Sequence, residues 1–293
     1  LAGGVVAGAA ATEGLAFRLQ GQPDFYRGYW ASIKPLYFPE ECGNYKKPVA
    51  ELKTCTVRKP DPARTLVIGD SHGEHLYAWF VRHSPGSVDF FTAAECPPVP
   101  QFERTQPGYV CKDYAAIAWR KAMSSDYGTV VVSARWPTVG LQGAPYCHQA
   151  GEGARCIAPP TLAAKQALIV SELKLAIGAA LKAGKTVVMV DGSPESRFRV
   201  PERIARELFW YGKVHLSVPM PSVIAQNLWL EPVFDAFRDT PGFHRISVRD
   251  RLCDSASCRV HDTALQRPIF IDESHFDPVW LAAQADLFAR FAR

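Results

Sequence analysis

Residues of three types that cooperate in acyl-transfer chemistry occur in two distant segments of this 293-residue chain. Ser71 lies in the segment 69–73 (Gly-Asp-Ser-His-Gly), where a short apolar run gives way to a helical pattern. Asp272 and His275 are separated by two residues, a spacing that lets the carboxylate hold one imidazole nitrogen. The other nitrogen is then free to take the proton of Ser71, so the pattern predicts a serine nucleophile with a histidine base and an orienting aspartate.

Ser71 by itself also fits a purely structural role, because serine commonly caps a helix that follows a strand. Asp70 fits the same capping role. Catalysis is favoured by the joint occurrence of two segments, one after an early predicted strand and one after a late predicted strand. At the start of a helix, the Ser71 amide is also placed to donate to an oxyanion.

The rest of the chain supplies the elements that must bring these residues together. Hydrophobic patterning predicts strands at 65–68, 88–91, 129–132, 186–190, 246–248 and 268–271, and helices around 76–81 and at 114–123, 161–183, 222–237 and 277–292. Strands that alternate with helices indicate a three-layer α/β/α, flavodoxin-like domain with a parallel sheet. Active sites in such sheets lie at the carboxyl ends of the strands, where both segments meet if they top one sheet.

The eight cysteines fall into four couples that are close in sequence: Cys42 with Cys55, Cys96 with Cys111, Cys147 with Cys156, and Cys253 with Cys258. None of the couples has the C-x-x-C spacing of a zinc or redox motif. Local disulfides are therefore the simplest interpretation, and they favour an oxidising compartment such as the periplasm. Eight reduced, buried cysteines in a cytosolic protein are the alternative.

Composition excludes several other classes of protein. The hydrophobic fraction of 47% and the charged fraction of 21% are typical of a globular protein. The net charge is +4, but lysine and arginine are scattered among the acidic residues, so we expect no nucleic-acid partner. His72 and His75, with Glu74 between them, are not expected to bind a metal, because the spacing is not H-E-x-x-H and no third ligand is apparent.

The amino-terminal part has a different character from the rest. Residues 1–11 are small and apolar, start with Leu1 and are too few to span a bilayer, so we interpret them as a cut end after an upstream signal or membrane segment. Residues 1–60 are expected to form an N-terminal extension or linker that follows a membrane domain. Residues 61–293 are expected to form the catalytic domain.

An early Gly-Asp-Ser-His and a late Asp-x-x-His, each after a strand, resemble the first and last blocks of the SGNH hydrolase superfamily. More narrowly, the segments 65–72, 96–98 and 130–136 and the Cys253 to Cys258 couple are similar to those of the periplasmic SGNH domain fused to membrane acyltransferase family 3 proteins. The resemblance runs from about Arg64 to the C-terminus. It implies that Ser71, Asp272 and His275 form a catalytic triad.

The resemblance also implies a function, since such proteins O-acetylate bacterial surface polysaccharides. The domain would move an acetyl group through an acyl-serine to a hydroxyl of a glycan such as the lipopolysaccharide O-antigen. The implied partners are the glycan acceptor and a membrane acyltransferase domain in the same full-length chain, which would deliver the acyl group, so no cofactor is expected. The implied location is the periplasm, tethered to the inner membrane.

Two other functions stay open at the level of sequence. A secreted carbohydrate O-acetyl esterase differs from a transferase only in whether water or a sugar attacks the acyl-serine. A non-catalytic, disulfide-stapled glycan-binding domain would instead stack sugars on aromatic residues, for which the candidates are Trp30, Trp79, Trp136, Trp210, Tyr211 and Trp229. The pattern Gly69-x-Ser71-x-Gly73 also matches the nucleophile elbow of α/β-hydrolases, but in that fold the acid lies well before the histidine.

The chain departs from the superfamily where an oxyanion glycine and asparagine would be expected. Segment 92–95 is Thr-Ala-Ala-Glu and segment 133–136 is Ser-Ala-Arg-Trp. Arg135, or a backbone amide of its loop, is the candidate for the second oxyanion donor beside the Ser71 amide. Arg135 fits a sugar-binding or anion-binding role, or a surface ion pair, equally well.

Overall fold

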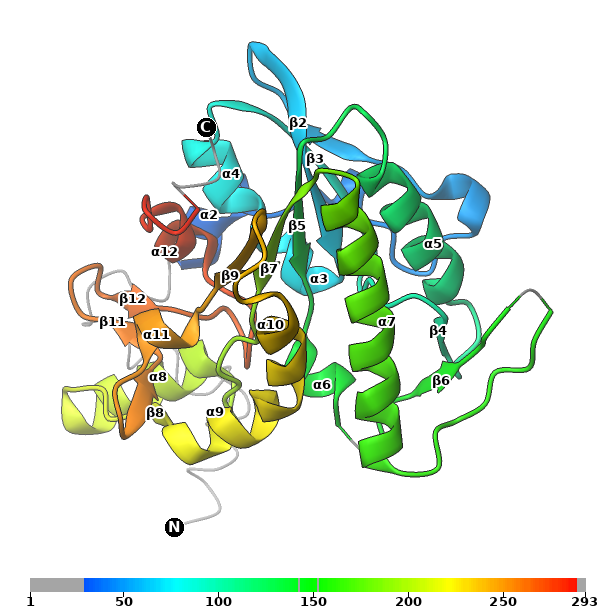
Figure 1. Ribbon diagram of the computed structural model, residues 1–293. Helices are drawn as coiled ribbons and strands as arrows, with labels where there is room; N and C mark the ends of the chain where they lie inside the picture. The colour runs from blue at the N-terminus through cyan, green and yellow to red at the C-terminus, as the bar shows by residue number, and fades with distance from the viewer. Residues whose placement is uncertain (1–28, 142, 152, 289–293) are drawn as a thin grey trace.

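The computed structural model describes residues 29–141, 143–151 and 153–288, and a twisted sheet lies at its centre (Figure 1). Within these residues the sheet has six strands in the order β1-β3-β2-β5-β7-β9. They are β1 (Cys55–Val57), β2 (Asp61–Gly69), β3 (Gly86–Thr92), β5 (Thr129–Ser133), β7 (Thr186–Val190) and β9 (Phe243–Ile246). Strands β3, β2, β5, β7 and β9 run parallel to their neighbours, and β1 pairs antiparallel with β3 at the edge.

Helices cover both faces of this sheet, which confirms the predicted three-layer α/β/α fold. On one face, α5 (Cys111–Ala122), α7 (Leu162–Lys182) and α10 (Glu231–Phe237) share a hydrophobic core with the sheet. On the other face, the core includes side chains of α4 (Tyr77–His83), α8 (Val200–Tyr211), α9 (Met220–Asn227) and α12 (Pro278–Ala282). Figure 1 shows α5 and α7 on the side of the sheet opposite to α4 and α12.

The central strands form because they are runs of β-branched residues that are buried on both faces. In β5, Val130, Val131 and Val132 have almost no exposed surface, and Val187 and Val188 of β7 are equally buried. Branched side chains pack well on a pleated surface, and buried parallel strands typically consist of continuous apolar residues.

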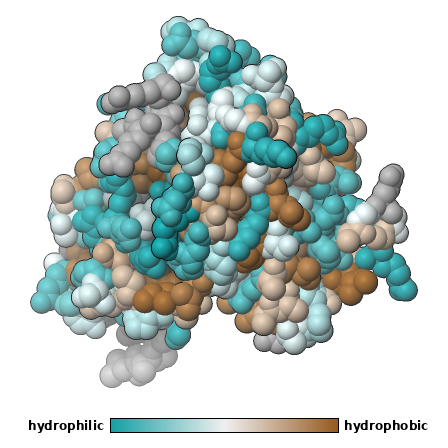
Figure 2. Space-filling model, viewed as in Figure 1, coloured by the Kyte–Doolittle hydropathy of each residue, from teal (hydrophilic) through white to brown (hydrophobic). Residues whose placement is uncertain are grey.

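On the face seen in Figure 2, hydrophobic and hydrophilic residues are interspersed over the surface.

Shorter elements connect the layers. The single-turn helices are α2 (Tyr29–Ile33), α3 (Ser71–Glu74), α6 (Trp136–Val139) and α11 (Arg249–Leu252), and the 3-10 helices are η2 (Lys34–Leu36), η3 (Glu40–Cys42), η4 (Val49–Glu51) and η5 (Leu228–Leu230). Antiparallel ribbons join β4 (Phe102–Arg104) to β6 (Tyr146–His148), β8 (Ser217–Pro219) to β10 (Ser257–Arg259), and β11 (His261–Asp262) to β12 (Arg267–Pro268).

The predicted strand 268–271 is wrong as a strand of the main sheet. Only Arg267–Pro268 form a strand, β12, and it pairs with β11 in a separate ribbon. The apolar residues that follow are buried for another reason, because Ile269 and Phe270 pack in the core on the α4 face. The segment before Asp272 and His275 is therefore a buried loop and not a sheet strand.

Other predicted boundaries need correction. The predicted strand 246–248 lies at Phe243–Ile246, and helix α8 was not predicted. The predicted helix 222–237 is interrupted by η5, where Pro232 at the start of α10 lacks the backbone donor that a continuous helix needs. The predicted helix 277–292 ends at Ala282, and its last four positions, 289–292, lie outside the described residues, as do residues 1–28.

The eight cysteines form the four predicted disulfides, Cys42–Cys55, Cys96–Cys111, Cys147–Cys156 and Cys253–Cys258. Disulfides persist in oxidising compartments, so they indicate a location outside the cytoplasm. The helices of the described residues include none that is both long and apolar enough to cross a membrane.

Candidate active site

Ser71 lies at the carboxyl end of the central strand β2, as the first residue of α3. Asp70 caps this short helix, because its Oδ1 accepts a hydrogen bond from the His72 backbone N–H at 2.8 Å. The turn requires glycine at position 69, since a Cβ there would lie 1.9 Å from the carbonyl oxygen of Ser133 on β5. The close approach of β2 to β5 and the Asp70 cap together hold the Ser71 hydroxyl at the carboxyl end of the sheet.

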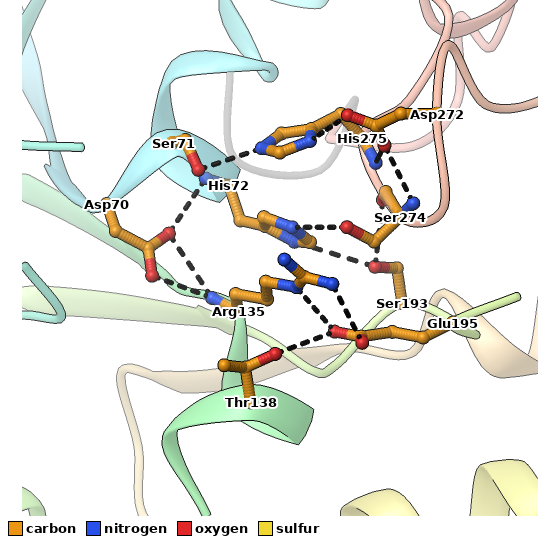
Figure 3. Close-up of polar contacts among 10 residues, drawn as sticks. All are labelled: Asp70, Ser71, His72, Arg135, Thr138, Ser193, Glu195, Asp272, Ser274 and His275. Atoms are coloured by element: carbon orange, nitrogen blue, oxygen red, sulfur yellow. Dashed lines mark hydrogen bonds and ion pairs between the residues drawn. The ribbon is translucent and has the colours of Figure 1, made fainter. Parts of the chain in front are cut away.

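Ser71, His275 and Asp272 form one row of hydrogen bonds, although Ser71 is far from the other two residues in the sequence (Figure 3). Ser71 Oγ lies 2.8 Å from His275 Nε2. His275 Nδ1 lies 2.7 Å from Asp272 Oδ2. An ionised carboxylate only accepts hydrogen bonds, so the proton resides on Nδ1 and leaves Nε2 as the acceptor for the serine hydroxyl.

Asp272 is held as an anion by its hydrogen bonds. Burial raises the pKa of this carboxyl, but the bond from His275 and the backbone N–H groups of Ser274 and His275 outweigh burial and place the pKa below its ordinary value. Both N–H groups donate to Asp272 Oδ1 at 2.8 Å. The carboxylate therefore orients the imidazole at any pH at which the histidine could act as a base.

The turn that carries Asp272 and His275 is closed by its own flanking residues instead of by the main sheet. Phe270 and Phe276 form an antiparallel bridge, and their rings stack with centroids 5.3 Å apart. The Ile271 N–H donates to the His275 carbonyl at 2.8 Å. These contacts make a tight hairpin whose tip presents the acid and the base to Ser71.

The segment that follows β7 supports the same turn from another side. The Ser193 hydroxyl donates to the Ser274 carbonyl at 3.2 Å. The N–H of Ser196 donates to the Glu273 carbonyl at 2.9 Å. Sequence reasoning missed this support, and the one available signal was that the segment follows a predicted strand and so must lie at the carboxyl edge of the sheet.

His72 and His75 pack in a layer against His275. The ring centroids of His72 and His275 lie 4.7 Å apart, as do those of His72 and His75. Burial, followed by the charge of His275, lowers the pKa of both His72 and His75 well below the usual value, so both rings are neutral. Among the described residues, no group of three or more His, Cys, Asp or Glu side chains is arranged to hold a metal ion.

Arg135 follows β5 and is engaged by two carboxylates. Its backbone N–H donates to Asp70 at 2.9 Å, and its guanidinium forms a bidentate ion pair with Glu195 at 2.9 and 3.1 Å (Figure 3). Burial raises the pKa of Asp70 to about 6, in spite of these donors. An ion pair was one of the roles that the sequence left open for Arg135, but its partner Glu195 was not predicted. The pair holds the loop after β5 against the loop after β7.

Glu74 is a further acidic group at the site. It lies on α3 three residues after Ser71, so both side chains share one face of the helix. Thr92 Oγ1 donates to Glu74 Oε1 at 3.4 Å, and burial, with help from Asp70, raises the pKa of Glu74 to about 7. The i, i+3 spacing from the serine was a signal that sequence reasoning did not use.

A small pocket of about 50 Å³ opens beside the Ser71 hydroxyl. It is lined by Leu36, Tyr37, Phe38, Ser71, Glu74, His75, Ile271, His275, Phe276 and Pro278. The walls are mostly hydrophobic, and the polar groups on them belong to Ser71, the two imidazoles, Glu74 and the Tyr37 phenol. Such a pocket suits a small, largely apolar group attached to an atom that Ser71 attacks.

The chain is similar to a known family in sequence and to solved structures in fold. The family model described as SGNH domain (fused to AT3 domains) matches residues 40–290. The periplasmic domain of the lipopolysaccharide acetyltransferase of Salmonella ser. Paratyphi A superimposes with a TM-score of 0.60 at 15% identity, covering 93% of this chain and 98% of that one. At such identity the likeness shows a shared fold.

A second solved structure, a putative acylhydrolase from Bacteroides fragilis, has a TM-score of 0.42 and 12% identity, and the match covers 83% of this chain and 91% of that chain. No curated protein matches the sequence. The family model spans nearly the whole described chain, including the segments of Ser71, Asp272 and His275. The chain therefore belongs to the family of SGNH domains that are fused to AT3 domains.

Proposed function

We propose that this chain is a serine-dependent O-acetyltransferase domain that places acetyl groups on hydroxyls of a bacterial surface polysaccharide. The observation that carries the proposal is the unbroken row of hydrogen bonds from Ser71 to His275 to Asp272, at 2.8 and 2.7 Å. A nucleophile, a base and an orienting acid in this geometry, next to a small pocket, suit attack on an acyl carbonyl.

In the first half-reaction, Ser71 Oγ forms a bond to the acetyl carbon while its proton passes to His275 Nε2. The negative charge collects on the former carbonyl oxygen, toward which the Ser71 backbone amide at the start of α3 donates. Arg135, the candidate for the second donor, is engaged elsewhere, because its backbone N–H donates to Asp70 and its guanidinium pairs with Glu195. As the tetrahedral intermediate collapses, the bond from carbon to the donor oxygen breaks and His275 returns the proton to that oxygen. The acetyl group is then an ester of Ser71.

In the second half-reaction, a sugar hydroxyl gives its proton to His275 Nε2 and attacks the acetyl-serine carbon. The bond from that carbon to Ser71 Oγ breaks, and the proton moves to the serine. Asp272 stabilises the imidazolium in both halves without taking up the proton. Attack by water in place of the sugar gives a carbohydrate O-acetyl esterase, which is the alternative function.

The family and the disulfides support a proposal for the acyl donor and for the location of the domain. Since the family is one of SGNH domains fused to AT3 domains, we propose that a membrane acyltransferase domain in the same full-length chain delivers the acetyl group. The four disulfides support a periplasmic location, and fusion to a membrane domain would tether it to the inner membrane. The lipopolysaccharide O-antigen is the proposed acceptor, by analogy with the Salmonella protein that shares the fold.

The alternative of a non-catalytic glycan-binding domain has less support. Trp79 and Trp136 are fully buried, so their rings are unavailable to sugars. Trp210 and Tyr211 are exposed at the end of α8, and neither of them lines the pocket beside Ser71. A binding module would also have no need of the hydrogen bond between Ser71 and His275.

Labelling with a serine-reactive fluorophosphonate tests the proposed chemistry. The wild-type chain and a Ser125→Ala control, which removes an exposed serine, are expected to become labelled, whereas Ser71→Ala is not. Incubation with p-nitrophenyl acetate followed by peptide mass spectrometry should place one acetyl group on the Ser71 peptide. Absence of label from the folded wild type would favour the binding module.

A second experiment separates transferase from esterase. A strain that carries the full-length protein with Ser71→Ala is expected to lose acetyl groups from its surface polysaccharide. An esterase predicts the opposite, because the same substitution would increase glycan acetylation.

A further inference from the structure

The pocket beside Ser71 has one wall that comes from outside the catalytic segments. Leu36, Tyr37 and Phe38 line it, whereas the other lining residues belong to α3, its C-cap, the turn after β12 and the start of α12. The 36–38 segment thus closes a space that α3 and the catalytic turn would otherwise leave open. A change in this segment alters the pocket without touching Ser71, His275 or Asp272.

The 36–38 segment is fixed in place. Phe38 is buried, and its ring packs against Tyr77 and Phe90 with centroids 5.6 and 5.9 Å away. The Cys42–Cys55 disulfide ties the following residues to β1 of the sheet. A wall with these anchors resists displacement by a ligand, because packed interiors do not yield freely to added atoms.

The size of the pocket matches a very short acyl group. A cavity of about 150 Å³ holds benzene, which has six non-hydrogen atoms, so a pocket of about 50 Å³ suits a group of only a few such atoms. An acetyl group has three non-hydrogen atoms, its carbonyl carbon, its oxygen and its methyl. A butyryl group adds two methylenes, and its chain would run into the fixed wall.

We propose that the 36–38 segment forms the wall of an acyl pocket that admits acetyl and excludes longer acyl chains, with Tyr37 as the side chain that sets the limit. The inference rests on the proposed function, because it identifies this space as the place where the acyl group of the Ser71 ester lies. Tyr37 is the residue to change: it is 48% exposed, whereas Phe38 also holds the core together.

The electrostatic surroundings of Tyr37 support this placement. Burial raises the pKa of its phenol, and the carboxylates of Asp272 and Glu74 raise it further. The phenol therefore lies close enough to Asp272 of the catalytic turn and to Glu74 of α3 for both carboxylates to affect its pKa. It stays neutral at physiological pH and presents a ring, not a charge, to the pocket.

Hydrolysis of a series of p-nitrophenyl esters (acetate, butyrate and hexanoate) tests the proposal. The wild type is expected to show its highest kcat/KM with acetate. Tyr37→Ala should raise the butyrate to acetate ratio of kcat/KM by about tenfold or more, the range for one or two methylenes in a hydrophobic pocket. Tyr37→Phe keeps the ring and should keep the ratio.

Tyr45→Ala is the matched control, since Tyr45 is 50% exposed and is not part of the pocket lining. It should leave the ratio unchanged. An unchanged ratio in Tyr37→Ala, with acetate hydrolysis intact, would overturn the acyl-pocket proposal alone. If Ser71→Ala hydrolyses the whole series as fast as the wild type, the proposed function fails, and the acyl pocket fails with it.

Discussion

The imidazole rings of His72 and His275 lie with their centroids 4.7 Å apart and their planes tilted by 54°. His72 directly follows the serine on α3, and its Nε2 lies 3.2 Å from the hydroxyl of Ser274, inside the turn that carries His275. The serine helix and the histidine turn are therefore joined by a second contact beside the hydrogen bond between Ser71 and His275. We expect this contact to help hold the angle at which His275 meets Ser71.

We expect His72→Ala to lower kcat for p-nitrophenyl acetate by roughly 10- to 100-fold, because a small displacement of a catalytic group has an effect of that size. KM should change little, since His72 is not part of the pocket lining. His72→Gln, which can keep a hydrogen bond to Ser274, should recover part of the rate. Equal losses in both variants, or a change confined to KM, would contradict a positioning role.

Asp272→Asn is expected to lower kcat by about 10⁴-fold, the loss seen when an amide replaces the acid of a serine triad. The amide can donate to the imidazole and so favours the tautomer with its proton on the nitrogen that faces Ser71. Steady-state kinetics on the same ester measures the effect. A loss of less than about tenfold would show that Asp272 does not orient His275 in the reaction.

Glu74 should make stability depend on pH. Its pKa rises from 4.5 to about 7 in the folded state, so between these values the folded protein holds a proton that the unfolded chain has lost. The free energy of unfolding therefore falls as pH rises through this window. Glu74→Gln, which has no proton to lose, should show a growing advantage in Tm from pH 5 to pH 8.

Thermal unfolding at pH 5, 6, 7 and 8 measures this difference, and Glu51→Gln on the exposed surface is the control. A Tm difference between Glu74→Gln and the wild type that is the same at pH 5 and pH 8 would rule out the raised pKa.

Gly69→Ala is expected to destabilise the fold by about 1–3 kcal/mol or more, as overpacking of a rigid interior does. The added Cβ would lie 1.9 Å from the Ser133 carbonyl oxygen. Strands β2 and β5 must therefore separate at their carboxyl ends, next to Ser71. Urea unfolding gives the change in free energy. Gly128→Ala is the matched control, because a Cβ at Gly128 meets nothing within 4 Å, and a similar loss there would point to a different cause.

The parts of the fold that could be predicted from sequence are those that local pattern determines. The strand predicted at 186–190 coincides with β7, and the helix predicted at 161–183 differs from α7 by one residue at each end. Both segments have strong local signals. The strand is a run of apolar, mostly β-branched residues, and the helix has an apolar face that follows the Thr161 cap. The contacts among Ser71, Asp272 and His275 were predictable, because a serine, an aspartate and a histidine suit one reaction and follow predicted strands.

The rest depends on contacts between distant segments, which no local pattern encodes. Ile269 and Phe270 look like a strand, but burial against α4 and α12 satisfies their hydrophobic side chains without sheet pairing. The sequence left the role of Arg135 open, and its ion-pair partner Glu195 could not be identified because it follows a different strand. The approach of Tyr37 to the nucleophile depends on where Phe38 finds its place in the core.

The pocket beside Ser71 is lined both by residues 36–38 and by residues 271–278, which are separated by most of the described chain. Residues 36–38 stay at this place because Phe38 packs in the core and the Cys42–Cys55 disulfide ties the residues that follow to β1. Removal of that disulfide would loosen the segment and leave the hydrogen bonds among Ser71, His275 and Asp272 intact. A protein in which Cys42 and Cys55 are both replaced by serine should therefore accept a wider range of esters than the wild type while it keeps its rate with acetate.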